Sequence, residues 1–132
     1  MGERSQDVSA RLLCVDDHSD TREMLMVLFR ANGYDAVTAG TFAKALELAR
    51  GGGFDAVILD SRLSDGSGVD LCKMVRAFDA EMPILFYSAA AYSEDAEAAF
   101  SAGANAYVTK PSDPKELVET VARVIQARGP LV

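Results

Sequence analysis

Short apolar runs alternate with longer amphipathic segments along the chain, and this alternation limits the possible folds more than any other feature. The apolar runs have the length of β-strands and lie at 12–15, 36–37, 56–59, 84–87 and 106–109. Between them, apolar residues recur at the spacing of an amphipathic helix. These segments predict helices at about 20–32, 42–50, 69–78, 93–102 and 114–128. Each predicted strand is therefore followed by a predicted helix.

Local signals mark the ends of several of these elements. Asp20 followed by Glu23 is typical of a capping box, and Asn32 with Gly33 is a stop signal for the same helix. The polar, glycine-rich residues 61–68 predict a loop.

The predicted strands are apolar throughout, which indicates that both faces of the sheet are covered. That pattern is typical of a parallel sheet between two layers of helices. We therefore predict an α/β fold of the flavodoxin-like, doubly wound (βα)5 type, with five parallel strands in the order 2-1-3-4-5. The expected domain spans 11–128, with a flexible N-terminal segment at 1–10 and a C-terminal tail at 129–132.

Composition excludes several classes of function. A length of 132 residues favours a single domain, and a net charge of −7 argues against direct nucleic-acid binding, which needs a basic surface. Two cysteines, Cys14 and Cys72, are too few for a disulfide framework, and we expect inert core thiols. The sequence contains no apolar run of membrane-spanning length and no signal peptide, so the cytoplasm is the default location.

Chemically active side chains stand where the predicted strands end. The first strand ends in Asp16 and Asp17, the third in Asp60, the fourth in Ser88 and the fifth in Lys110. In open α/β sheets, ligands bind outside the carboxyl ends of the strands. These five side chains should therefore meet in one crevice.

Oxygen ligands without histidine or cysteine suit Mg²⁺ or, alternatively, Mn²⁺. Lys110 adds a compact positive charge, and the Ser88 hydroxyl can donate a hydrogen bond. This set fits a phosphoryl-transfer site with a carboxylate as the candidate nucleophile. His18, beside the acidic pair, is interpreted as an exposed loop residue without a role.

Four motifs in the right order and spacing resemble the receiver domain of response regulators (CheY-like) in two-component, phosphorelay signal transduction. The resemblance covers about 11–128. It is carried by Leu13-Cys14-Val15-Asp16-Asp17, by Val57-Ile58-Leu59-Asp60 with Asp65-Gly66-Ser67-Gly68, by Tyr87-Ser88-Ala89, and by Tyr107-Val108-Thr109-Lys110-Pro111.

The resemblance implies a role for each matching residue. Asp60 is the expected phosphoacceptor, which would make the chain a phosphoprotein. Asp17 and Asp60 are expected to bind Mg²⁺ directly, Asp16 through water, and Arg62 through its backbone carbonyl. No other cofactor is implied.

The last two motifs imply further roles. Ser88 and Lys110 are expected to contact the phosphoryl oxygens, and Tyr107 to be the aromatic switch residue. Ala89 is small and would leave the site accessible, and the peptide bond between Lys110 and Pro111 is expected to be cis.

The resemblance also implies partners. A histidine kinase or histidine phosphotransfer protein would supply the phosphoryl group, with no enzymatic role beyond self-phosphorylation and autodephosphorylation. A downstream protein or a second copy would bind the surface formed by 93–102, 106–109 and 114–128, and neither nucleic acid nor membrane would bind directly. Ser64 departs from the proline common in the family, so the loop 61–68 is expected to be less rigid.

Three other functions compete with this hypothesis. A phosphatase of the haloacid-dehalogenase type also uses Mg²⁺ and an aspartate, but it needs Asp-x-Asp after its first strand, where this chain has adjacent Asp16 and Asp17. A flavodoxin needs a Ser/Thr/Gly-rich phosphate loop there, and residues 17–20 are too acidic. A degenerate receiver that only binds proteins would not need the intact acidic set.

Overall fold

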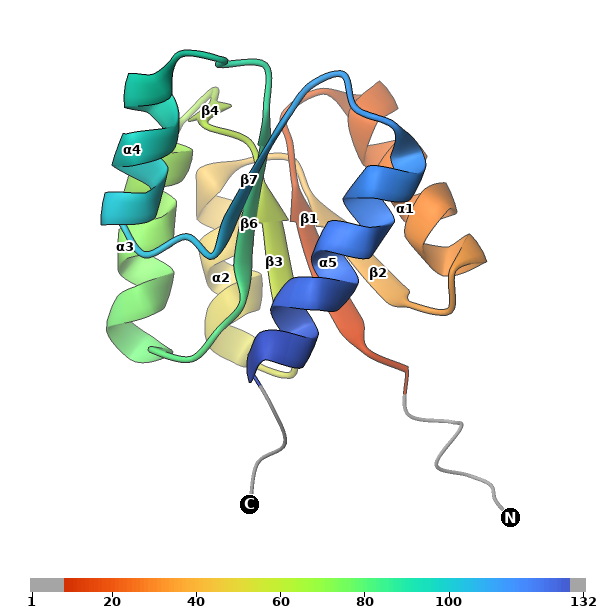
Figure 1. Cartoon of the computed structure of the whole chain (residues 1–132). Helices are drawn as coiled ribbons and strands as arrows, with labels where there is room; N and C mark the ends of the chain where they lie inside the picture. Colours follow the sequence, from red (N-terminus) through yellow and green to blue (C-terminus); the bar gives the residue numbers. More distant parts are fainter. Residues whose placement is uncertain (1–8, 129–132) are drawn as a thin grey trace.

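Figure 1 shows the computed structural model of the chain, which describes residues 9–128. Most of the predicted N-terminal segment 1–10 and the whole predicted tail 129–132 lie outside the described residues. Within 9–128, a five-stranded parallel sheet lies between two layers of helices. The predicted fold class is therefore confirmed.

The elements follow the predicted alternation. The strands of the sheet are β1 (Arg11–Val15), β2 (Asp35–Ala39), β3 (Ala56–Leu59), β6 (Ile84–Ser88) and β7 (Ala106–Thr109). The helices are α1 (Ser19–Ala31), α2 (Phe42–Gly51), α3 (Gly68–Phe78), α4 (Ser93–Ser101) and α5 (Pro114–Arg128).

The order of the strands sets which strand ends are neighbours. It is β2-β1-β3-β6-β7, which is the predicted 2-1-3-4-5 when the strands of this sheet are counted along the chain. The register is close to level, with Val15 opposite Leu59 and Leu59 opposite Phe86. The carboxyl ends of β1, β3 and β6 therefore lie side by side at one edge of the sheet.

Each face of the sheet has its own hydrophobic core. On one face, Leu25 and Phe29 of α1 and Leu117 and Val121 of α5 pack against residues such as Ile58. On the other face, α2, α3 and α4 cover Val57, Leu59 and their neighbours. Because successive residues of a strand point to opposite faces, a strand covered on both sides needs apolar residues at every position. This is the physical reason for the continuous apolar runs.

Two local predictions were wrong. Helix α1 begins at Ser19, and its N-cap is His18, whose side chain makes no capping hydrogen bond, so Asp20 lies in the first turn instead of at the cap. The predicted loop 61–68 contains a small antiparallel hairpin, formed by β4 (Arg62–Leu63) and β5 (Gly66–Ser67).

The hairpin is anchored to the start of α2. The Asp65 carboxylate accepts hydrogen bonds from the backbone N–H groups of Phe42 at 2.7 Å and Ala43 at 3.1 Å. The Phe42 bond is the largest of the effects that hold the pKa of the Asp65 carboxyl below its ordinary value. These contacts tie the segment after Asp60 to a neighbouring helix, although Ser64 replaces the usual proline.

Both cysteines lie in the core, as predicted. Burial raises the pKa of the Cys14 thiol to about 12, so this side chain stays a protonated thiol at neutral pH. Among residues 9–128, no helix has the length and apolar character that crossing a bilayer requires.

The start of α3 yields a stability prediction. A Cβ on Gly68 would collide with the backbone carbonyl oxygen of Asp60 and with the Leu59 side chain. We expect Gly68→Ala to lower the free energy of unfolding by at least roughly 1–3 kcal/mol, the usual cost of forcing extra atoms into packed structure. Gly51→Ala is the control, because a Cβ at Gly51 meets nothing within 4 Å. Urea unfolding followed by circular dichroism measures both, and equal stabilities would contradict the predicted close approach.

Candidate functional site

The predicted site residues meet at the carboxyl edge of the sheet. Asp16 and Asp17 follow β1, Asp60 follows β3, Ser88 is the last residue of β6 and Lys110 follows β7. Side-chain contacts or a shared cleft connect all five of them. The sheet order and register bring them together from segments that are far apart in the sequence.

The ammonium group of Lys110 lies between two buried carboxylates. Its Nζ donates to Asp16 Oδ2 at 2.7 Å and to Asp60 Oδ2 at 3.1 Å. Asp16 is 1% exposed and Asp60 is 8% exposed, so water screens neither of them well. Burial by itself would lower the pKa of Lys110, but the two carboxylates outweigh it and raise the pKa above its ordinary value. Lys110 therefore stays charged throughout the neutral range.

Asp16 is held on several sides. Its Oδ1 accepts a hydrogen bond from the backbone N–H of His18 at 2.9 Å, and its backbone carbonyl accepts one from Arg22 at 2.8 Å. Asp17 is freer, with a side chain that is 29% exposed. This contrast agrees with the expectation that Asp17 contacts a metal directly and Asp16 through water.

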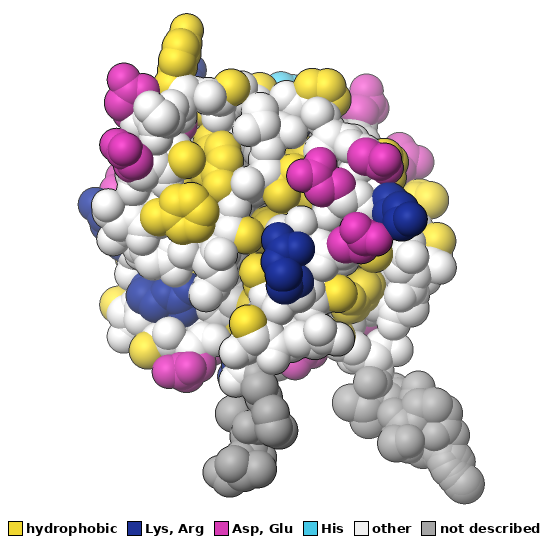
Figure 2. Space-filling model, viewed as in Figure 1, with side chains coloured by type: hydrophobic (Ala, Val, Ile, Leu, Met, Phe, Trp, Pro, Cys, Tyr) yellow, Lys and Arg dark blue, Asp and Glu magenta, His cyan; other side chains and the backbone are white. Residues whose placement is uncertain are grey.

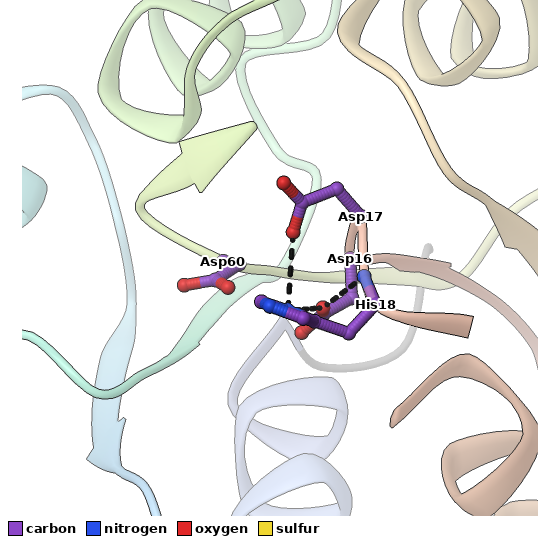
Figure 3. Close-up of side chains that lie close together, drawn as sticks. All are labelled: Asp16, Asp17, His18 and Asp60. Atoms are coloured by element: carbon purple, nitrogen blue, oxygen red, sulfur yellow. Dashed lines mark hydrogen bonds and ion pairs between the residues drawn. The ribbon is translucent and has the colours of Figure 1, made fainter. Parts of the chain in front are cut away.

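His18 belongs to the site, although sequence reasoning gave it no role. Figure 3 shows its ring beside Asp16 and Asp17, with Nδ1 at 3.1 Å from one carboxylate oxygen of each. The ring nitrogen thus lies within hydrogen-bonding distance of both carboxylates. The signal available in the sequence was the position of His18, directly after the acidic pair at a strand end.

These side chains form a candidate metal site. The ligand atoms of Asp16, Asp17, His18 and Asp60 all lie within 4.8 Å of one another. Clustered carboxylate oxygens suit Mg²⁺ or Mn²⁺. The donor set therefore fits the predicted cation.

Asp60 opens onto a cleft of about 360 Å³. At about 30 Å³ for a water molecule in the liquid, this space can hold a phosphoryl group and a hydrated cation. The cleft is lined by Asp17, His18, Asp60, Arg62, Ser88, Ala89 and Ala90. Arg62, Ser88 and Ala89 thus lie where the sequence predicted them to be.

The predicted switch residue, Tyr107, is linked to the site by hydrogen bonds. Its hydroxyl donates to the backbone carbonyl of Ala90 at 2.5 Å, and its ring stacks on Phe86 with centroids 5.8 Å apart. The backbone N–H of Ala90 in turn donates to the Ser88 hydroxyl at 3.1 Å. Ala90 therefore connects Ser88 to Tyr107. The neighbouring peptide bond between Lys110 and Pro111 is cis, as expected.

Comparison with known families and curated proteins agrees with this geometry. The model of the response regulator receiver domain family matches residues 12–122. The DNA-binding response regulator MtrA of Mycobacterium tuberculosis is 37% identical over 111 residues, 84% of this chain and 48% of MtrA. The transcriptional regulatory protein PrrA of Mycobacterium bovis is 36% identical over 121 residues, 92% of this chain and 52% of PrrA. The chain thus spans about half the length of these relatives.

Solved structures share the fold. The chemotaxis protein CheY4 of Vibrio cholerae superposes with a TM-score of 0.84 at 29% identity, covering 89% of this chain and 99% of CheY4. A CheY-like response regulator receiver domain protein from Methanospirillum hungatei gives a TM-score of 0.88 at 24% identity, covering 92% of this chain and 97% of that chain. At that identity, the second likeness concerns the fold alone.

The buried charge pairs predict a strong effect of Lys110→Met on stability. The substitution leaves Asp16 and Asp60 without their cation, so we expect the free energy of unfolding to fall by about 3 kcal/mol. Lys115→Met, at an exposed lysine of α5, should change it little.

The same pair of variants tests the direction of the Lys110 pKa shift. Because the folded-state pKa is raised, the ammonium contributes stability up to the unfolded pKa of about 10.4, and that contribution is lost as the pH rises through the folded value. The difference between wild type and Lys110→Met should therefore hold from neutral pH to about pH 10 and shrink above it. Denaturant titrations across this range measure it, and a difference that already disappears at pH 8 would contradict the shift.

Proposed function

The chain belongs to the response regulator receiver domain family of two-component systems, and from this premise we propose that it accepts a phosphoryl group on Asp60. The donor is a phosphohistidine of a histidine kinase or a histidine phosphotransfer protein. The proposed domain spans 11–128, and the chain carries no enzymatic activity beyond self-phosphorylation and autodephosphorylation.

The observation that carries the proposal is the environment of the Asp60 carboxylate. Its Oδ2 faces the Lys110 ammonium, its Oδ1 accepts a hydrogen bond from the Ser61 N–H at 2.7 Å, and the group opens onto the cleft. In the proposed step, a carboxylate oxygen of Asp60 attacks phosphorus. The N–P bond of the phosphohistidine breaks, its electron pair stays on the imidazole, and an acyl phosphate forms.

Charge is the main obstacle to this step, because a phosphoryl group brings further negative oxygens to three carboxylates. Lys110 offsets part of that charge, and the Ser88 hydroxyl can donate a hydrogen bond to a phosphoryl oxygen. A bound Mg²⁺, or alternatively Mn²⁺, supplies the remaining positive charge. We propose that Asp17, Asp60 and the backbone carbonyl of Arg62 hold it directly and that Asp16 acts through water.

The phosphatase, flavodoxin and degenerate-receiver hypotheses are less well supported. The adjacent Asp16 and Asp17 lack the Asp-x-Asp pattern of the phosphatase, and no phosphate loop follows β1. A degenerate receiver has no need for Lys110 to be placed on both Asp16 and Asp60.

We propose that phosphorylation changes the surface formed by α4, β7 and α5. A phosphoryl oxygen draws the Ser88 hydroxyl away from Ala90, whose carbonyl holds Tyr107. Helix α4 is the expected moving part, because Ala99 is its one buried residue within the described chain. A preference of about 1.4 kcal/mol shifts a two-state ratio tenfold, so one new hydrogen bond to a charged acceptor is sufficient.

The same surface is the proposed binding face for a downstream protein or a second copy. Figure 2 views the molecule from this side and shows hydrophobic side chains over α4, with acidic ones near its upper end. Phe100 and Tyr92 are its exposed aromatic residues. The names of MtrA and PrrA refer to DNA binding and transcription, but this chain spans about half of each. With a net charge of −7, we propose that this domain does not bind DNA itself.

Phosphorylation of Asp60 is testable by intact mass. With acetyl phosphate and Mg²⁺, the protein should gain the mass of one phosphoryl group, and Asp60→Asn should abolish the gain. Asp70→Asn, at an exposed aspartate of α3, is the matched control and should keep it. A phosphoryl gain that survives in Asp60→Asn would place the acceptor elsewhere.

Propagation of the switch is testable by NMR with beryllofluoride and Mg²⁺, which imitate the phosphoryl group. Amide shifts should spread from Asp60 to residues 88–110 in the wild type. Ser88→Ala should confine them to the cleft, whereas Ser101→Ala, at an exposed serine of α4, should leave the pattern unchanged. Shifts that stay inside the cleft of the unmodified protein would rule out a conformational output.

A further inference from the structure

We propose that His18 is a nitrogen ligand of the cation site, which gives this cleft a selective affinity for divalent transition metals such as Zn²⁺, Co²⁺ and Ni²⁺. The proposal deepens the proposed function, since it concerns the same cleft, and it rests on that function only in placing a cation there. The imidazole of His18 changes which divalent cations the site binds most tightly.

The position of the ring supports this role. His18 Nδ1 lies 3.1 Å from Asp16 Oδ1 and 3.1 Å from Asp17 Oδ1, so this nitrogen is close to an oxygen of each carboxylate. Metal–ligand distances of 2.0–2.2 Å place two ligands of one ion at most about 4.4 Å apart. In a tetrahedral site the ligands lie about 3.4 Å apart, so the His18–Asp17 separation of 3.1 Å already fits one ion, and the full set, within 4.8 Å, has to contract by up to about 1.5 Å. With the ring proton on Nε2, the Nδ1 lone pair is available, and a cation can bridge the ring and the carboxylates.

The other contacts indicate which groups would share the ion with His18. Asp16 already binds the Lys110 ammonium through Oδ2 and the His18 backbone through Oδ1. Asp17 makes no such buried ion pair, and Asp60 keeps one oxygen away from Lys110. The expected protein ligands are therefore the carboxylates of Asp17 and Asp60 and the imidazole of His18.

The chemistry of the ligands sets the selectivity. Mg²⁺ takes oxygen ligands and keeps several waters, so it gains little from an imidazole. Zn²⁺, Co²⁺ and Ni²⁺ bind imidazole well. A site made of oxygen ligands alone already binds these ions more tightly than Mg²⁺. The contribution of His18 is therefore the part of the affinity difference between Zn²⁺ and Mg²⁺ that is lost when the imidazole is removed.

The side chain is also free to act as a ligand. It is 72% exposed, and it makes no capping hydrogen bond to α1 although His18 occupies the N-cap. Removing the ring should therefore leave the start of the helix intact. The chain contains one histidine, so any imidazole signal from untagged protein comes from His18.

The experiment compares Mg²⁺ and Zn²⁺ binding to untagged wild type, His18→Ala and His18→Asn by titration calorimetry. We expect both variants to lose roughly tenfold or more of the Zn²⁺ affinity, in line with the preference of this ion for imidazole. Their Mg²⁺ affinity should fall by a clearly smaller factor than their Zn²⁺ affinity, since Mg²⁺ favours oxygen. Asp17→Asn, which removes a ligand common to both ions, should weaken both.

Long-range ¹H–¹⁵N NMR of the His18 ring gives a direct readout, since Zn²⁺ is diamagnetic. Zn²⁺ should shift the ring nitrogens at one equivalent, and Mg²⁺ should leave them nearly unchanged. Equal Zn²⁺ affinity in wild type and His18→Ala, or unshifted ring nitrogens, would overturn the proposal while Mg²⁺ binding and the proposed function stand. Loss of Mg²⁺ binding in the wild type would instead count against the proposed function.

Discussion

The contact of the Lys110 ammonium with both Asp16 and Asp60 is the interaction on which the rest of the site depends. It connects the ends of β1, β3 and β7, which come from three distant parts of the chain. Two carboxylates this deeply buried are costly unless a cation compensates them. The lysine makes their burial tolerable, and it leaves Asp17 and the second oxygen of Asp60 facing the cleft. Asp16 is therefore fixed by its contacts with Lys110 and the His18 backbone, whereas Asp17 and Asp60 can still bind a ligand in the cleft.

The two hydrophobic cores hold the ends of the strands in place, whereas the loops that follow the strands are held by different local contacts. Strands β1, β3 and β6 are buried on both faces, so core packing holds their last residues in position. After β3 the chain is held by the Asp65 contacts to α2 and by the close approach of Gly68 to Asp60. After β6 the chain is held by hydrogen bonds through Ala90, to the Ser88 hydroxyl and from the Tyr107 hydroxyl. The proposed conformational response runs through these hydrogen bonds on the β6 side, away from the hairpin.

The sequence predicted the sheet, its order and the five convergent side chains, because continuous apolar runs and the residues that end them can be read directly from the chain. It missed features that depend on local backbone direction or on contacts between distant segments. Asp16 accepts the His18 N–H, and this turn starts α1 before the expected cap at Asp20. The hairpin in 61–68 is anchored through Asp65 to Phe42, 23 residues away, which composition cannot reveal. The ring of His18 turns toward the acidic pair for a similar reason, since only the folded turn gives its direction.

The numbers of negative and positive charges in the cleft are unequal. Three carboxylates, from Asp16, Asp17 and Asp60, lie around the Lys110 ammonium, and the guanidinium-bearing Arg62 lines the same cleft, so the negative charge is only partly offset. A divalent cation held by these carboxylates would lower the negative charge that an anionic donor meets. Under the proposed function, the concentration of free divalent cations would therefore affect how readily the cleft accepts a phosphoryl group.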